Sequence, residues 1–395
     1  MVLKENYKNI SRMHICFITS EFPKPGFPHG GVGTFIATLG KALLKKGVQV
    51  SVVGINNYTH VEEVSNEEGI NVYRLKLKKV KGLTWCFNIQ SINKKIKEIH
   101  QQNPIDIVEG TELGLAFLDK LPNIKYVIRM NGGHHFFAEA ENRKTEWLKR
   151  ILEKRSFKKA DGILAVSVYV AETTRRLLRL GNVPITIIYN PIDSEKFYQS
   201  NPDLIQRHTI LFAGSIVEKK GIRQLVQSLN YLIDEFPDVH LYIAGRDAFL
   251  PGTRIPYRPI LEKEINDHIK SHITFLGVVP NSKMVTHIEK AEICCYPSHM
   301  EAMPLAWLEV LAMGKAFIGG SSGPGPEAVI DGETGLLADP HNPESIADKI
   351  RFLFNNADAG QELGKKARER IKREFTIEVV VLKNIEYYQS LINKQ

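Results

Sequence analysis

Short runs of apolar residues alternate with longer amphipathic stretches from Met13 onward. The first run, residues 14–20, is followed by a Pro/Gly-rich segment and then by apolar positions at helical spacing from Thr34. Further strands are expected at 48–54, 71–77, 105–110, 125–132, 161–167 and 185–190. Near-continuous Val/Ile runs separated by helices are typical of a parallel sheet covered on both faces.

The same rhythm starts again after a polar, Pro-punctuated stretch at 190–208, which we expect to be a linker. The strands expected beyond it are 209–215, 239–245, 273–277, 293–298 and 316–320. The simplest interpretation is α/β, with two doubly wound, Rossmann-like domains in tandem that face each other across a cleft. In such a fold the loops that follow the strands carry the chemistry.

Composition narrows the class of protein. The 395 residues contain no apolar run long enough to span a membrane, and the N-terminal residues lack the apolar core of a signal peptide, so we expect a cytoplasmic protein. The four cysteines show no C-x-x-C spacing, which argues against a structural zinc site or a disulfide framework. Residues 1–200 hold 30 basic and 19 acidic side chains, whereas residues 201–395 hold 22 and 25. The net charge of +8 therefore belongs to the N-terminal half, which suggests an anionic partner there.

Two glycine-containing segments follow the first strand of each half. Gly31 and Gly33 lie between a strand and a helix, where glycine permits close approach of a ligand and a helix N-terminus attracts anions. Residues 212–221 repeat this design with Gly214, Ser215, Lys219 and Lys220. A tight turn and a solvated lysine pair are the alternatives at these two places.

The strongest local feature is residues 297–314, where Pro304 suits the start of a short helix and Gly314 its end. Glu301 lies in the loop before this helix and Glu309 inside it. Eight residues of helix separate two carboxylates by about 12 Å, too far for a metal pair or a two-carboxylate hydrolase. The spacing suits two acceptors for different hydroxyls of one extended ligand, with the helix N-terminus facing its phosphates.

Five motifs in order resemble the retaining, nucleotide-sugar-dependent glycosyltransferases of the GT-B fold, and within them the family 4 group. They are the GGVG segment, NPID-x-x-x-F at 190–197, residues 214–221, the E-x7-E pair at 301 and 309, and residues 331–340. The resemblance implies an N-terminal acceptor-side domain at 13–192, a C-terminal nucleotide-sugar-binding domain at 205–375, and a final helix at about 376–392 that returns to the first domain.

The resemblance also implies roles for individual residues. Glu301 would hold hydroxyls of the donor sugar and Glu309 the ribose, while Lys220 would balance the diphosphate. Backbone N–H groups near Met303 and Leu305, and the segment from Gly31 to Gly33, would assist. No metal or other cofactor is expected, and the sequence has no D-x-D triplet.

The chain departs from the family pattern at three places, one of which is Ala302-Met303-Pro304 where the family usually has a Gly-rich turn. Ser215 stands where the family usually has Arg, so that Lys219, Arg223 or Arg246 would have to supply the missing cation. Asn131 stands where the family often has His, and either His134 or His135 would then contact the donor sugar near the reacting centre. A structural or solvated histidine is the alternative.

The segment from Glu141 to Lys159 carries eight basic residues and an apolar stripe of Trp147, Leu148, Ile151 and Leu152. Two interpretations stand: peripheral contact with an anionic membrane at its inner face, where a lipid-linked acceptor would lie, or a core-facing stripe on an ordinary basic helix. For the whole chain we expect a hexosyltransferase-type enzyme of polysaccharide biosynthesis that takes a nucleotide sugar and a saccharide or lipid-linked acceptor. The alternatives are a non-hydrolysing sugar-nucleotide epimerase of the same fold and a basic nucleic-acid-binding protein. Binding of nucleic acid is not expected, because the basic residues are not interleaved with stacking aromatics.

Overall fold

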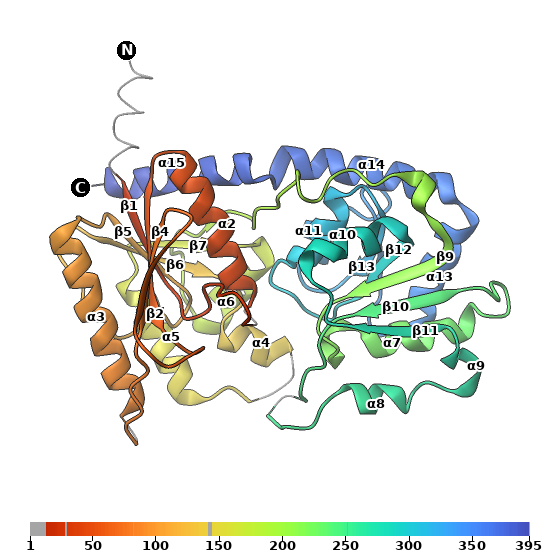
Figure 1. Ribbon diagram of the computed structural model, residues 1–395, viewed down its shortest axis with the longest axis horizontal. Coiled ribbons are helices and arrows are strands. Elements are labelled where there is room, and N and C mark those ends of the chain that lie inside the picture. Colours follow the sequence, from red (N-terminus) through yellow and green to blue (C-terminus); the bar gives the residue numbers. More distant parts are fainter. Residues whose placement is uncertain (1–12, 28–29, 82, 141–143, 251, 395) are drawn as a thin grey trace, which may run out of the picture. The chain divides into compact units, whose positions relative to one another are not determined.

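The structure is a computed structural model of the chain, and it describes residues 13–27, 30–81, 83–140, 144–250 and 252–394. The chain divides into two compact units. Unit 1 comprises Met1–Pro191 and Ile377–Gln395, and unit 2 comprises Ile192–Thr376. Each unit has its own sheet and its own core (Figure 1).

The sheet of unit 1 has the strand order β3-β4-β2-β1-β5-β6-β7-β8. Its strands are β1 (His14–Ile18), β2 (Gln49–Ile55), β3 (Glu63–Glu67), β4 (Ile70–Leu75), β5 (Ile107–Gly110), β6 (Lys125–Met130), β7 (Gly162–Ala165) and β8 (Thr186–Ile187). All neighbours pair in parallel except β3 and β4. The antiparallel β3 was not predicted from the sequence, because its alternating EVSNE segment has only one apolar residue.

Helices cover both faces of this sheet. They are α2 (Gly31–Lys45), α3 (Thr84–Gln102), α4 (His134–Ala140), α5 (Trp147–Lys159), α6 (Val168–Leu178) and α15 (Ile377–Ile392). α15 lies alongside α2 on one face, and α3 covers the opposite face (Figure 1). Val380, Ile385 and Tyr388 of α15 are buried in the same core cluster as Leu39 and Leu43 of α2, so the last helix completes the core of unit 1.

The sheet of unit 2 has the strand order β11-β10-β9-β12-β13-β14, with every pairing parallel. Its strands are β9 (Gln206–Ala213), β10 (His240–Ala244), β11 (Ile273–Gly277), β12 (Ala291–Tyr296), β13 (Ala316–Gly320) and β14 (Leu336–Ala338). Its helices are α7 (Ile222–Ser228), α8 (Arg258–Glu262), α9 (Asp267–Lys270), α10 (Asn281–Lys290), α11 (Leu305–Ala312), α12 (Gly325–Ala328), α13 (Pro343–Asn355) and α14 (Ala357–Glu374). Three short 3-10 turns are η1 (Pro202–Leu204), η2 (Glu218–Lys220) and η3 (Leu229–Tyr231).

The strand order confirms two doubly wound α/β domains. In unit 2 the chain moves from β9 outward to β10 and β11, then returns to β12 on the other side of β9. In unit 1 the same reversal separates β1 from β5. Ligands of open parallel sheets bind outside the carboxyl ends of the strands at such a reversal, so each unit has one place where a ligand is expected.

A buried polar network attaches α15 to the sheet of unit 1. Arg129 of β6 is 2% exposed, and its Nε donates to Glu109 Oε1 of β5 over 2.7 Å. Its Nη2 donates to Asn384 Oδ1 over 2.5 Å, and the hydroxyl of Tyr388 donates to Glu109 Oε2 over 2.7 Å. Two residues of α15 therefore satisfy an ion pair that the sheet has removed from water, which stabilises the helix in this position.

Candidate active site

Two loops meet at the carboxyl ends of β9 and β12, where the strand order of unit 2 reverses. The loop after β9 reaches Gly221, which has φ +68°, and a Cβ at this position would lie 1.8 Å from the carbonyl oxygen of Pro297 in the loop after β12. Only glycine combines that backbone conformation with so close an approach. The N–H of His299 also donates to the carbonyl of Lys219 over 2.9 Å, so the two loops form one surface.

Lys220 and Glu301 form a salt bridge across this surface, Nζ to Oε1. Their side chains are 23% and 14% exposed. A half-buried ammonium and carboxylate therefore lie in contact at the expected ligand position, brought together from residues that are 81 positions apart.

Glu309 adds a second carboxylate on α11, one helix turn beyond the helix start. Pro304 is the N-cap of α11, and the preceding Met303 is 4% exposed. Burial raises the pKa of Glu309 to about 7, with Lys196 opposing the rise. Among the described residues no hydrogen bond or ion pair reaches the Glu309 carboxylate, and a desolvated acidic group without a partner is typical of a ligand site.

Ser215 lies beside β10. The cations that could replace an arginine here differ in whether another side chain of the protein already binds them. Arg223 is held by Glu218, to which its Nη2 donates over 2.6 Å and its Nε over 3.0 Å. Arg246 follows β10, its carbonyl accepts the N–H of Ile216 over 2.9 Å, and its side chain is exposed. Within the described part of the chain the Arg246 guanidinium has no ion pair, so it is a cation near Ser215 that a ligand could reach.

The corresponding place in unit 1 lies between the carboxyl ends of β1 and β5. Gly31 and Gly33 belong to the first turn of α2, which corrects the expectation of a glycine loop before Thr34. A Cβ on Gly33 would lie 1.9 Å from the carbonyl oxygen of Glu21, so the helix start packs tightly against the segment that follows β1. The first N–H groups of the 15-residue α2 therefore point to this edge of the sheet.

Asn131 follows β6 at the same edge and is half-buried. Its N–H donates to Glu112 Oε1 over 2.6 Å, and its side-chain amide donates to the carbonyl of Arg129 over 3.2 Å. Burial raises the pKa of Glu112 to about 7. The backbone of Asn131 is thus fixed by a buried carboxyl group.

The two histidines after Asn131 differ in their surroundings. His135 is 5% exposed, and its Nδ1 bonds Glu153 of α5. Glu153 also accepts the N–H of His134 over 2.7 Å, while the ring of His134 stays half-buried. His135 therefore has the surroundings of a structural residue that ties α4 to α5, whereas the less buried His134 ring accepts the N–H of Glu146 over 3.4 Å.

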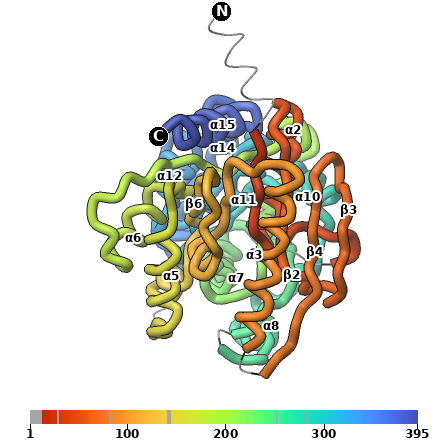
Figure 2. The backbone as a smooth tube through the Cα atoms, turned by 90° about the vertical axis from the view of Figure 1, so that its left-hand side faces the viewer, coloured from red at the N-terminus to blue at the C-terminus, as the bar shows by residue number. Residues whose placement is uncertain are grey.

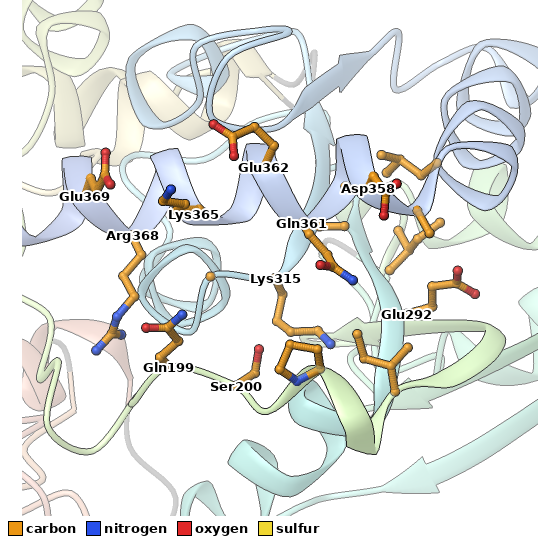
Figure 3. Close-up of a pocket in the computed structure, with 18 of the residues that line it drawn as sticks. Gln199, Ser200, Glu292, Lys315, Asp358, Gln361, Glu362, Lys365, Arg368 and Glu369 are labelled. Atoms are coloured by element: carbon orange, nitrogen blue, oxygen red, sulfur yellow. The ribbon is translucent and has the colours of Figure 1, made fainter.

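A polar pocket of about 600 Å³ lies elsewhere in unit 2 (Figure 3). Its lining includes Glu292 at the start of β12, Lys315 before β13, and Gln361 and Arg368 of α14. These residues belong to the amino ends of the strands and to α14, so none of the predicted site residues lines this pocket.

Two further findings concern the described residues. They contain no group of three His, Cys, Asp or Glu side chains that could hold a metal ion. None of their helices has both the length and the apolar character needed to cross a membrane.

Comparison with known proteins shows what this arrangement is similar to. The sequence family Glycosyl transferases group 1 matches residues 194–370, and Glycosyltransferase Family 4 matches residues 29–196. An uncharacterized glycosyltransferase of Methanocaldococcus jannaschii is 25% identical over 377 residues, which are 93% of this chain and 97% of the relative.

Solved structures have the same fold. Sucrose-phosphate synthase of Thermosynechococcus elongatus superimposes with a TM-score of 0.82 at 18% identity, over 97% of this chain and 100% of that chain. HepE of Anabaena, in complex with UDP-glucose, superimposes with a TM-score of 0.72 at 15% identity, over 96% of this chain and 100% of that chain.

Two parallel α/β domains with these matches define a glycosyltransferase of the GT-B fold. The two family matches together run from residue 29 to residue 370, and the chain belongs to the family 4 group of glycosyltransferases.

Proposed function

We propose that this glycosyltransferase transfers a sugar from a nucleoside diphosphate sugar, bound by unit 2, to a saccharide or lipid-linked acceptor bound by unit 1, with retention of anomeric configuration and without a metal ion. The observation that carries the proposal is the Lys220–Glu301 salt bridge at the place where the strand order of unit 2 reverses. A cation and a hydroxyl acceptor are adjacent there, as a sugar joined to a diphosphate requires.

Departure of a nucleoside diphosphate leaves negative charge on the phosphate next to the sugar. In this proposal Lys220 and the N–H groups at the start of α11, near Leu305, stabilise that charge. Glu301 accepts hydrogen bonds from hydroxyls of the sugar, and the ionised Glu309 accepts them from the ribose. A preorganised cation on a rigid loop can do this without Mg²⁺ or Mn²⁺.

Arg246 completes the positive charge at the diphosphate in our proposal. The site has Ser215 where an arginine would add a second cation, and Arg223 is already bound to Glu218. Arg246 is exposed and follows β10, and its carbonyl accepts the N–H of Ile216 next to Ser215, which favours it among the cations that the sequence suggested.

The HepE structure contains UDP-glucose, so uridine diphosphate sugars are the first donors to test. The purified chain is screened by thermal shift against UDP, GDP, ADP and TDP sugars, each with and without EDTA. We expect one nucleotide series to raise the melting temperature, equally in EDTA.

The donor found in this way is then used to determine the stereochemistry of the transfer. Proton NMR of the first product, recorded before any mutarotation, reports the configuration of the anomeric carbon. Retention supports the proposal. Inversion would contradict the proposed retention of configuration, and dependence on added Mg²⁺ or Mn²⁺ would contradict the role of Lys220 as the principal counter-ion.

A further inference from the structure

Helix α5 presents its apolar residues to solvent. Trp147 is 73% exposed, Leu148 53% and Ile151 51%, whereas Glu153 and Phe157 on the other side of the helix are buried. The interpretation of this stripe as core-facing is therefore wrong for these three residues, whereas Leu152, the fourth, is half-buried. Arg143, which belongs to the same basic segment, lies outside the described residues.

A second group of exposed apolar side chains lies at the N-terminal end of α3. Leu83 is 51% exposed, Trp85 54% and Phe87 36%. The ring of Phe117 joins this group to α5, because it lies 4.6 Å from the ring of Trp85 and 5.2 Å from the guanidinium carbon of Arg155. Figure 2 shows α3 and α5 running toward the same end of unit 1.

We call the exposed side chains of these two groups, with the cations around them, the α3–α5 surface. Four of its cations form no ion pair or hydrogen bond within the described part of the chain: Lys144, Arg150, Lys154 and Lys158. Lys78, Lys79 and Lys81 are exposed just before α3. Two nearby acidic side chains have partners: Glu146 pairs with Lys149 over 2.7 Å, and the buried Glu153 contacts the ring of His135.

The positions of the three tryptophans also single out the α3–α5 surface. The chain has three, and Trp307 is 2% exposed in the core of unit 2. The other two, Trp85 and Trp147, are both on the α3–α5 surface. Tryptophan is the residue that prefers the boundary between lipid headgroups and acyl chains.

We infer that the α3–α5 surface docks on an anionic lipid bilayer. Trp147, Leu148 and Ile151 would enter the headgroup region, and the unpaired cations would lie at the lipid phosphates. A second copy of the chain fits this surface less well, because a two-fold contact would place the same unpaired cations against one another.

The α3–α5 surface lies near the edge of the unit 1 sheet at which we expect the acceptor. α3 and α5 begin after the carboxyl ends of β4 and β6, the same edge of the sheet that carries Asn131 and the first turn of α2. A lipid-linked saccharide reaching unit 1 from the bilayer would arrive at that edge. This consequence rests on the proposed function, but the docking itself does not.

The test is sedimentation of the full chain with phosphatidylcholine vesicles that contain 30 mol% phosphatidylglycerol, and with pure phosphatidylcholine vesicles, without any nucleotide sugar. We expect binding to the anionic vesicles at low salt, loss of binding as salt is raised, and little binding to the neutral ones. Tryptophan emission of the wild type should shift to shorter wavelength on binding, and Trp147→Phe should remove most of that shift.

Two double variants separate the contributions. Arg150→Glu with Lys154→Glu should weaken binding at least about 25-fold, at about fivefold for each lost cation. Trp147→Ser with Ile151→Ser should weaken it by about tenfold or more while retaining the preference for anionic lipid. The matched control is Lys45→Glu with Lys46→Glu at the end of α2, two exposed lysines away from the surface, which should bind as the wild type does.

Absence of vesicle binding at low salt would overturn the inference. So would equal loss of binding in the Lys45/Lys46 control, since that would show attraction by net charge alone. A concentration-dependent dimer that the Trp147/Ile151 variant abolishes, without vesicle binding, would assign the surface to a protein contact instead. None of these outcomes bears on the donor chemistry, which is measured separately with soluble substrates.

Discussion

Lys220 and Glu301 form a salt bridge across 81 positions of sequence. A diphosphate that binds Lys220 must therefore compete with Glu301 for the ammonium group. The donor sugar offers hydroxyls that replace the lost partner of Glu301, whereas a nucleoside diphosphate alone does not. If a nucleotide sugar is the donor, as we propose, the salt bridge thus favours the complete nucleotide sugar over its leaving group.

This competition predicts opposite effects of two substitutions on binding of the nucleoside diphosphate alone. Lys220→Ala removes the cation and should weaken binding by ten- to a hundredfold. Glu301→Gln frees Lys220 and should tighten binding by up to about fivefold, because half-buried pairs of this kind are worth about 1 kcal/mol or less. Isothermal titration calorimetry measures both, and both variants should transfer sugar at least a hundredfold more slowly.

Lys270→Ala is the matched control, since Lys270 is an exposed lysine at the end of α9, at the amino end of β11. It should leave binding and turnover unchanged. Weaker binding in Glu301→Gln would show that Glu301 does not compete with the diphosphate.

Much of this site follows from the sequence, for a physical reason. Gly214, Lys220, Glu301 and Glu309 occur in segments that follow strands, and the carboxyl ends of parallel strands meet at one edge of a sheet. Local pattern and topology therefore predict that they lie at one edge, and the Lys220–Glu301 salt bridge confirms this for those two residues. The contact between Gly221 and the carbonyl of Pro297 could not be predicted, because it depends on the path of two loops.

Arg246 is the next residue to test. Arg246→Gln should raise the KM for the donor by about tenfold, because one cation at the diphosphate is lost, with a smaller change in kcat. Adding Ser215→Arg should restore the KM, since it returns a cation to the loop after β9, next to Arg246. Arg254→Gln, in the same exposed loop, is the control. Failure of Ser215→Arg to restore donor affinity would mean that Arg246 has another role.

The raised pKa of Glu309 leads us to expect that ionisation of this residue lowers stability but favours donor binding. Burial raises its pKa to about 7, so the folded state holds this proton more tightly than the unfolded state does. Stability therefore falls as pH rises from the usual carboxyl range to about 7, and above pH 7 the ionised, unpaired group is a net cost.

Glu309→Gln removes that cost. The variant should be more stable than the wild type at pH 8, by at most about 3 kcal/mol, and nearly equal to it at pH 5. It should also bind donor more weakly at pH 8, because an amide is a poorer acceptor for ribose hydroxyls. Melting temperatures and donor titrations at the two pH values check both statements. A variant less stable than the wild type at pH 8 would show that the carboxylate has a stabilising partner.

The attachment of α15 could be predicted only in outline. The length and apolar residues of 376–392 fit a helix that returns to the first domain, and α15 does complete the core of unit 1. The Tyr388–Glu109 hydrogen bond spans 279 residues, and nothing in the pattern around Glu109 or Arg129 marks them as an ion pair inside the sheet. Charged residues in a strand normally indicate an exposed face, so periodicity misplaces them.

The network predicts a graded loss of stability. Glu109→Gln leaves the Arg129 guanidinium buried without its counter-charge and should cost about 3–5 kcal/mol. Tyr388→Phe removes one hydrogen bond to that carboxylate and should cost about 1.5–3 kcal/mol. Urea denaturation of the full chain, followed by far-ultraviolet circular dichroism, measures both. Tyr231→Phe, at a tyrosine that is 49% exposed in unit 2, is the neutral control. Equal stability of Glu109→Gln and the wild type would show that Arg129 finds another partner.

Substitution of His135 should lower stability, whereas substitution of His134 should lower activity. His135 is buried and bonded to Glu153, so His135→Ala leaves a cavity and an unpaired carboxylate and should cost about 2–4 kcal/mol. Glu153→Gln should show the same loss, because an amide has only one oxygen, whereas the carboxylate accepts from the His135 ring and from the N–H of His134 with different oxygens.

His134→Ala should keep the wild-type melting temperature and lower kcat under saturating donor if its half-buried ring contacts the reacting sugar. The measurement is melting temperature and kcat on the same preparations. A His134→Ala enzyme with wild-type kcat would exclude that contact and make Asn131 the next residue to substitute, whereas a His135→Ala enzyme that is stable but inactive would return the catalytic role to His135.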